Sequence, residues 1–450
     1  MAVEEISFLT SLVFWKLYET NLNYTSKNLQ EVMKDGKYAS RLYDGYYFEN
    51  FEGERMPLKW IARTGKFFLP ICMKCHSDQF KHKDLPEISG KVQIDAHLFP
   101  EGVIVMQGKL DFQNYMTIEQ HIKASIPTDV ILTQGSKSLF DTLNQFADEI
   151  TQFLKSKMKR QKGELGETKA SPWHHNWIWW KSKPEIPIHE FDIGGKYEKW
   201  SLGMCTRSDK WPWLNPEKYA TNIEAFYNLS PYAGNCVYIT HPGNCIIPSK
   251  QFTDPNSVKN TLIDVLFAAE LGNVQRYLIL NHLQDFNFKS LEIQELLYKF
   301  EEEESISLKE LIKRLEDIEE EINGLVLEIN YDLQVTRTPR LIFTSVFKTK
   351  LFRQMIDSLH GFDFLNSLES IISEIKDSLS RERDVVGIKV NEAENVFLRN
   401  LQIVFIVELI ASMIGLFYIL GDFTWDLGMI FIIISIIGSL GILYLLKRVK

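Results

Sequence analysis

Two long apolar runs near the end of the chain constrain its fold more than any other feature. The run 401–420 contains twenty residues with one charge, Glu408, and the run 427–446 contains twenty residues with none. Each is long enough to cross the roughly 30 Å hydrocarbon core of a bilayer as a helix. Two buried helices of a soluble domain are the alternative, but helices of this length normally carry more polar residues. The pattern therefore predicts two transmembrane helices.

The connection between the two predicted spans is short. Residues 421–426 form the whole loop, so the spans are expected to be antiparallel neighbours in a helical hairpin. Lys389 and Arg399 precede the first span, the tail 447–450 is basic, and the loop carries only acids. By the positive-inside rule, both termini are expected in the cytoplasm and the loop on the outer side of the plasma membrane.

The composition limits what the remaining 400 residues can do. They suffice for two or three domains. The first residues carry acids where a secretory signal has a basic region, and Thr10, Ser11 and Lys16 interrupt the apolar stretch, so no targeting segment is predicted. The net charge of -9 argues against binding of nucleic acid by the chain as a whole. The five cysteines are expected to stay reduced in the cytosol.

Residues 1–255 are predicted to form a cytosolic α+β or α/β sensor domain. The segment 91–112 alternates apolar and polar residues on either side of a turn, which is typical of a hairpin with one buried face. Apolar residues recur at steps of four and three over 139–153, which indicates an amphipathic helix. Residues 158–171 have little to bury and are predicted to be a linker or mobile loop. Strand-like pieces surround a turn in 235–249.

The pattern becomes helical after residue 255 and stays helical through the predicted stalk region 256–400. A 3,4 repeat of Leu and Ile over 308–329 indicates a coiled coil. A second heptad series begins near residue 364 and keeps its phase up to the first apolar run. The sequence therefore predicts one unbroken stalk helix from about 364 to 420 that leads into the membrane.

A hairpin of two helices cannot enclose an ion pathway, so transport requires a symmetric oligomer. Glu408, Ser412 and Gly415 fall on one face of the first span, and a carboxylate within a membrane normally marks a pathway. Around an axis, Glu408 would form one acidic ring, and Asp422 and Asp426 would form another at the outer mouth. Such rings select cations. The alternative is that Glu408 only hydrogen-bonds neighbouring helices.

The order of these parts resembles the CorA-type magnesium transporter superfamily, which has a cytosolic domain, a stalk helix, two C-terminal spans and a basic tail. The segment 395–423, with its "GLFY" at 415–418, is similar to the stalk-to-pore segment of that family. The resemblance covers the last fifth of the chain. It implies a homopentamer whose first spans line the pore and whose cytosolic part gates it.

The chain departs from the family at the outer end of the first span. CorA-type proteins carry Gly-Met-Asn there, whereas Ile419, Leu420 and Gly421 follow Tyr418 here. Divergent CorA-like proteins without this filter resemble membrane effectors of type III CRISPR antiviral defence, which a nucleotide second messenger switches. The resemblance implies a ligand-gated oligomeric channel or effector. A divalent-cation (Mg²⁺) transporter and a membrane-anchored coiled-coil adaptor are the alternatives.

The tryptophans suggest where a ligand binds. Seven of the ten lie between Trp173 and Trp213. Tryptophan rings can stack on bases, and nearby cations can meet phosphates. The residues predicted to bind a nucleotide-like ligand are Trp173, Trp177, Lys181, Arg207, Lys210, Trp211 and Trp213. The alternative is that these tryptophans pack a core.

One motif has the spacing of a metal or haem site. Cys72, Cys75 and His76 match haem c attachment and half of a zinc site. Haem attachment needs export, and the second half of a zinc site is missing, so buried thiols are the favoured interpretation. No cofactor is assigned, and a divalent cation and a nucleotide remain open as ligands. The sequence lacks the common catalytic motifs, and no enzyme activity is predicted.

Overall fold

A computed structural model describes residues 6–20, 26–34, 36–43, 45–49, 55–58, 61–63, 66, 68–157, 169–192, 194–213, 215, 236–239, 243–247, 255–302, 308–420 and 433. The chain divides into two units. The first comprises Met1–Asn287 and Gly324–Ile371, and the second comprises Phe288–Asn323 and Ile372–Lys450.

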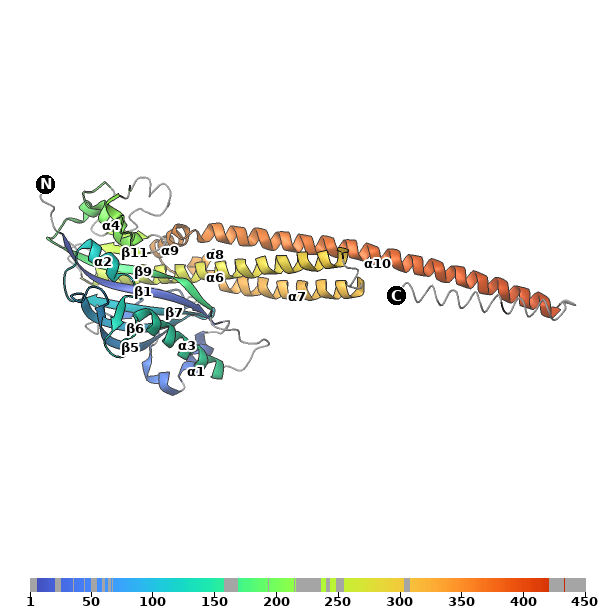
Figure 1. Ribbon diagram of the computed structural model, residues 1–450, viewed down its shortest axis with the longest axis horizontal. Helices are drawn as coiled ribbons and strands as arrows, with labels where there is room; N and C mark the ends of the chain where they lie inside the picture. The colour runs from blue at the N-terminus through green and yellow to red at the C-terminus, as the bar shows by residue number, and fades with distance from the viewer. Residues whose placement is uncertain are drawn as a thin grey trace. The chain divides into compact units, whose positions relative to one another are not determined.

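Strands and short helices make up the N-terminal part, and long helices follow (Figure 1). The N-terminal elements are β1 (Ser7–Glu19), α1 (Ser26–Met33), η1 (Gly36–Arg41), β2 (Leu42–Tyr43), β3 (Tyr47–Glu49), β4 (Arg55–Pro57), β5 (Ile71–His82), β6 (Ser89–Leu98), β7 (Val103–Phe112), α2 (Ile118–Ala124), β8 (Val130–Leu132), α3 (Leu139–Lys157), β9 (Lys169–Lys183), η3 (Ile188–Phe191), α4 (Glu198–Thr206), η4 (Trp211–Trp213), β10 (Cys236–Ile239) and β11 (Gly243–Ile247). The later helices are α6 (Pro255–Glu302), α7 (Leu308–Asp332), α8 (Gln334–Arg337), η5 (Pro339–Leu341), α9 (Val346–Ser358) and α10 (Gly361–Leu420). This order confirms the predicted α+β arrangement.

A nine-stranded sheet lies at the centre of the first unit. Its strand order is β10-β11-β9-β1-β7-β6-β5-β2, and β8 pairs with β5. All pairs are antiparallel except β11 with β9. The predicted hairpins 91–112 and 235–249 are confirmed as β6–β7 and β10–β11. The predicted loop 158–171 is wrong for its last residues, 169–171, which begin β9, and 158–168 lie outside the described residues.

One face of the sheet forms the apolar core with the helices α2, α3 and α4. Met73, Ala96 and Met106 are directly opposite one another on β5, β6 and β7 and point into this core. The predicted amphipathic helix 139–153 is confirmed as α3, whose Leu143 and other apolar side chains are buried here. Each fully buried side chain of this size contributes about 1.5–3 kcal/mol.

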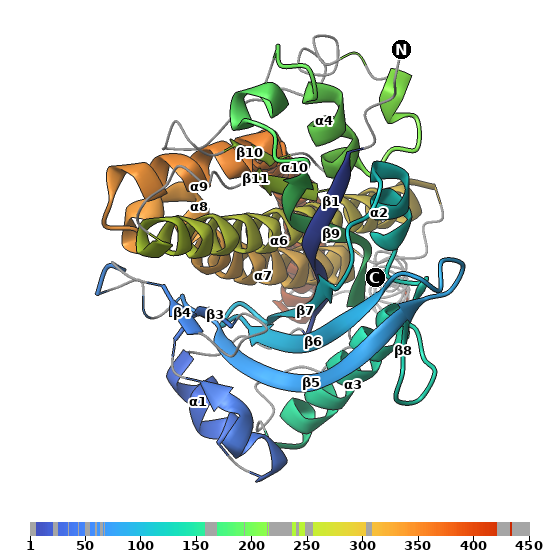
Figure 2. The ribbon, with the colours of Figure 1, turned by 90° about the vertical axis from the view of Figure 1, so that its left-hand side faces the viewer.

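The other face of the sheet is also buried. α6 and the chain around Tyr46–Glu49 cover it, because Glu270 of α6 contacts His97 of β6 and Glu49 contacts Lys109 of β7. Figure 2 shows α3 and α6 on opposite sides of the strands. The prediction that the β6–β7 hairpin has only one buried face is therefore wrong, because α6 packs on the face that was expected to meet solvent.

The helical predictions are confirmed. α7 buries Leu311, Leu315, Ile318 and Ile322, the apolar positions of the predicted coiled coil. α10 is continuous over 60 residues and contains the whole predicted stalk helix. Within the second unit α7 and α10 pack together, and Arg383 and Glu319 form an ion pair of 3.2 Å between them.

The predicted spans are only partly described. In the ranges that the structure covers, no helix is long and apolar enough to cross a bilayer. Residues 401–420 form the end of α10, with side chains described for 401–410 and for Ser412. The predicted loop 421–426, the second predicted span 427–446, except Ile433, and the tail 447–450 lie outside the described residues.

Candidate functional site

Lys16 is a buried cation in the middle of β1. It lies directly opposite Met106 of β7 and His174 of β9, which places it on the apolar face of the sheet. Only 4% of the residue is exposed, and its Nζ lies 3.5 Å from the centre of the Phe140 ring. Burial lowers the pKa of Lys16 from 10.5 to about 8. Among the residues that the structure describes, no carboxylate pairs with it.

Arg207 approaches His174 from the end of α4. It follows the last helical residue with φ +54°, a left-handed conformation that costs a side chain with a Cβ about 1–2 kcal/mol. Its Nη1 donates a hydrogen bond of 2.6 Å to Nε2 of His174. Because Nε2 accepts this bond, the His174 ring is neutral.

The pKa values around this contact agree with a neutral ring. Burial, together with the charges of Arg207 and Lys16, lowers the pKa of His174 to about 4. Burial also lowers the pKa of Arg207. Its Nε atom is buried and has no hydrogen-bond partner within the described ranges.

Lys16, His174 and Arg207 therefore form a basic cluster that draws on β1, β9 and the end of α4. Buried cations are normally paired with acids, because an unpaired buried charge is costly. Here the described residues supply aromatic neighbours instead: Phe140 lies beneath Lys16, and the Phe14 ring lies 5.9 Å from that of His174. A phosphate or carboxylate group would provide the missing negative charge, and charge-assisted hydrogen bonds to lysine and arginine are strong.

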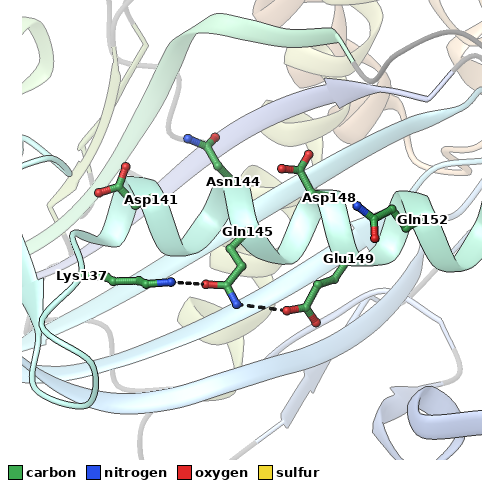
Figure 3. Close-up of a pocket in the computed structure, with 7 residues that line it drawn as sticks. All are labelled: Lys137, Asp141, Asn144, Gln145, Asp148, Glu149 and Gln152. Carbon is green, nitrogen blue, oxygen red and sulfur yellow. Dashed lines mark hydrogen bonds between the residues drawn. The ribbon is translucent and has the colours of Figure 1, made fainter.

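A groove of about 530 Å³ runs along α3 (Figure 3). Its lining residues are Lys137, Asp141, Asn144, Gln145, Asp148, Glu149 and Gln152. Tyr18, whose ring lies 5.7 Å from Lys16 Nζ, donates a hydrogen bond to Asn144. Burial and the charge of Asp148 raise the pKa of Tyr18, which keeps this donor protonated. The three carboxylates of the groove make it unsuitable for an anion, so the anion is expected at the basic cluster.

The structure separates the residues that were predicted to bind a ligand. Arg207 belongs to the basic cluster. Trp211 packs against Trp200 at 5.0 Å between ring centres. Lys210 and Trp213 are exposed, and 86% of Trp213 is accessible to solvent. These residues lie around α4 and offer an aromatic surface.

Trp177 lies elsewhere. It is 1% exposed and directly opposite Val13, on the face of β9 that is turned away from His174. The alternative interpretation, that the tryptophans pack a core, describes Trp177. Lys181 is exposed, and the side chain of Trp173 lies outside the described residues.

The sequence motif at Cys72, Cys75 and His76 lies in β5. Both cysteines are buried free thiols, and Nε2 of His76 lies 4.0 Å from Oδ2 of Asp78. In the described part of the chain, no group of three or more His, Cys, Asp or Glu residues is arranged to hold a metal ion.

The predicted pore residues are described only in part. Glu408 and Ser412 are exposed on α10, the surroundings of Gly415 are not described, and Asp422 and Asp426 lie outside the described residues. The acidic rings remain a prediction.

Sequence reasoning found Arg207 but missed Lys16 and His174. The signal for Lys16 was a lysine in the middle of the apolar run SFLTSLVFWKLYE. The sequence did not indicate that His174 lies beside Lys16, because β1 and β9 are far apart in the chain. Comparison of the chain with protein-family models, curated proteins and solved structures found no match.

Proposed function

We propose that the protein is an oligomeric, CorA-like membrane channel or membrane effector that is gated by an anionic ligand bound at the basic cluster. In this proposal α10 connects the α+β unit to a two-helix membrane hairpin of 401–420 and 427–446. The protein forms a homopentamer in the plasma membrane, with both termini in the cytoplasm.

The observation that carries the proposal is the end of α10. The helix begins at Gly361 and continues without interruption into the apolar run. Its exposed large apolar side chains there are Leu401, Ile403, Phe405, Ile406, Val407, Leu409 and Ile410. Because these residues are nearly consecutive, they surround the helix rather than forming one stripe. Apolar surface of this extent is unfavourable in water, and lipid or a second copy of the helix removes that penalty.

The basic cluster supports the proposal that the ligand is anionic. The aromatic surface around α4 supports a ligand that also contains a flat ring. Arg207 and Lys16 suit phosphate oxygens, and the exposed ring of Trp213 suits a base. A nucleotide second messenger combines these features. With the resemblance to CorA-like effectors, this leads to a role in type III CRISPR antiviral defence.

The second candidate is a divalent-cation transporter. The exposed carboxylate of Glu408, in the middle of an apolar helix, favours it. A membrane-anchored coiled-coil adaptor is a candidate from a different functional class. Its function would not require the Glu408 carboxylate.

Ion flux through purified protein in liposomes tests the proposal. Magnesium and potassium are measured separately, together with dye leakage, with and without a panel of nucleotide second messengers. Flux or leakage that requires one nucleotide is the expected result. Magnesium flux without any nucleotide would favour the transporter, and silence from correctly inserted protein in every condition would favour the adaptor.

Two sets of variants locate the effect. Arg207→Gln and Lys16→Met should abolish the nucleotide response, whereas Lys210→Ala, which removes an exposed cation near the same helix, should retain most of it. Glu408→Leu should change the flux and leave nucleotide binding intact. Equal responses of the Arg207 and Lys210 variants would exclude the basic cluster as the binding site.

A further inference from the structure

A chain of buried hydrogen bonds lies on the face of the sheet opposite to the basic cluster. Cys72 of β5 and His97 of β6 are directly opposite each other in register, so their side chains are neighbours on the same face of the sheet. Nδ1 of His97 lies 2.6 Å from Oε1 of Glu270 in α6. The other oxygen of this carboxylate accepts a hydrogen bond of 2.7 Å from the hydroxyl of Tyr46. The chain thus links a nucleophile, a base and an acid, drawn from three elements.

The protonation states along this chain follow from its surroundings. Burial and the charge of Glu270 raise the pKa of Tyr46, so its hydroxyl stays protonated and donates. Burial alone would lower the pKa of His97. The charges of Cys72 and Glu270, together with the hydrogen bond between Nδ1 and Glu270, outweigh burial and raise it well above 6.5. Since Nδ1 faces the carboxylate, Nε2 is the ring nitrogen left for the thiol.

We propose that Cys72 is a reactive thiol that small hydroperoxides oxidise, with His97 as its base and with Glu270 and Tyr46 as the residues that position His97. In the reaction the sulfur attacks one oxygen of the peroxide, an S–O bond forms and the O–O bond breaks. The sulfur is oxidised to sulfenic acid and the peroxide is reduced. His97, whose raised pKa favours the imidazolium form, already holds the thiol proton when the sulfur attacks, and it gives this proton to the leaving oxygen, which departs as water or an alcohol.

The burial of the site selects the oxidant. Cys72 is 1% exposed, so only a small uncharged molecule such as hydrogen peroxide can reach it through fluctuations of the structure. This inference is independent of the proposed membrane function, because all four residues belong to the α+β unit and none touches the basic cluster.

The chain provides its own control in Cys75. This residue lies in the same strand and is 7% exposed, slightly more than Cys72. Its thiol contacts only the backbone carbonyl of Met73, at 3.9 Å, among the partners that the structure gives it. Burial raises the pKa of the Cys75 thiol, and the charge of Asp95 adds to the effect. Local opening of β5 would expose both thiols, whereas only Cys72 has a base beside it.

The test is oxidation of the purified full-length protein by hydrogen peroxide. Sulfenic acid is trapped with a dimedone reagent at successive times, and the labelled cysteines are counted by mass spectrometry. Cys72 is expected to react roughly ten-fold or more faster than Cys75, as befits a thiol with a positioned base. Equal rates for the two thiols in the wild-type protein would overturn the proposal.

Two variants separate catalysis from opening of the structure. His97→Gln should slow Cys72 to the rate of Cys75, and an unchanged Cys72 rate would also overturn the proposal. Tyr46→Phe keeps the packing but removes the hydrogen bond to Glu270, and it should reduce the Cys72 rate by a smaller factor. The Cys75 rate monitors opening in each case. His97→Gln could also loosen the structure, in which case both thiols are oxidised faster. The Tyr46→Phe variant then provides the test: an unchanged oxidation rate of Cys72 in that variant contradicts the proposal that Tyr46 and Glu270 position His97.

Discussion

Two groups of charged side chains lie against opposite faces of the same sheet, and they differ in their partners. On the apolar face, the basic cluster of Lys16, His174 and Arg207 has no carboxylate partner among the described residues. On the other face the charges alternate in sign. We call this second group the paired row, and it contains Lys109, Asp95, Lys74, Glu49 and Arg55.

The geometry of the paired row accounts for the burial of Lys109, Asp95 and Glu49, whereas Arg55 is exposed. Lys109 Nζ lies 2.5 Å from Asp95, and Glu49 contacts Lys74 at 2.9 Å and Arg55 at 3.2 Å. Burial alone would raise the pKa of Glu49, but the hydrogen bonds and charges of Lys74 and Arg55 lower it below 4.5. Charges that satisfy one another in this way hold β3 against β5 and β7 of the sheet.

The basic cluster is different because no such compensation is present. Burial lowers the pKa of Lys16, which favours the neutral amine, and no described acid opposes this shift. An unpaired buried charge lowers the stability of the folded protein. The difference favours a structural role for the paired row, and it supports the proposal that the basic cluster binds an anionic ligand.

The largest effect is expected from breaking the paired row. Asp95→Ala leaves Lys109, which is 1% exposed, without its carboxylate, and should lower the free energy of unfolding by about 3–5 kcal/mol. Urea denaturation of the full-length protein in detergent measures this loss. Glu369→Ala is the control, because its partner Arg337 and its own carboxylate are at least one-third exposed, and it should cost about 0–1 kcal/mol. Similar losses in both variants would contradict a structural role for the row.

Glu101, in the β6–β7 turn, is a buried acid whose carboxylate has no hydrogen-bond partner within the described ranges. Burial, with the charge of Asp332 adding, raises its pKa from 4.5 to about 8. The folded protein therefore holds a proton that the unfolded chain releases above pH 4.5, so this group makes stability fall as pH rises from 4.5 to 8.

Glu101→Gln should remove this pH dependence. The variant is expected to resemble the wild type at pH 5 and to exceed it by roughly 3 kcal/mol at pH 8. Denaturation curves at several pH values measure the difference between the two proteins. A difference that does not change between pH 5 and pH 8 would show that the carboxylate is paired in the folded state.

Lys16→Met should stabilise the ligand-free protein. The substitution shortens the unbranched side chain by one atom and removes an unpaired charge, so a gain of about 1 kcal/mol is expected after solvent screening. The pKa of Lys16 is lowered from 10.5 to about 8, so the advantage of the variant should be complete below pH 8 and should fade as pH rises toward 10.5. Thermal melting at pH 7 and pH 10 provides the measurement.

Lys91→Met is the matched control for this change, because Lys91 lies in β6 and is exposed. It should alter stability by less than about 0.5 kcal/mol at either pH. If Lys16→Met destabilises the protein as much as a core substitution does, the lysine is paired and the basic cluster is structural.

The sequence by itself determined the elements whose signal is local. α3, α7 and α10 follow from apolar residues spaced at three and four positions, and the β6–β7 hairpin follows from alternation around a turn. These patterns are readable because each helix or hairpin is formed by residues that are close in the chain. Arg207 was predicted from the sequence as a ligand-binding cation; the structure places it beside His174, and its role in binding stays a prediction.

Only the tertiary structure decided which residues meet. The pairing of β1 with β9 brings Lys16 to His174, and the pairing of β5 with β6 brings Cys72 to His97. A shift of one residue in either register would place the two side chains of the pair on opposite faces of the sheet. In β9 it would also move Trp177 from its buried position opposite Val13 to the apolar face. The register is set by the burial of both faces of the sheet, to which α6 contributes from the far side. No local pattern in β1 or β9 carries that information, because the free energy that selects the register comes from contacts between segments more than 150 residues apart.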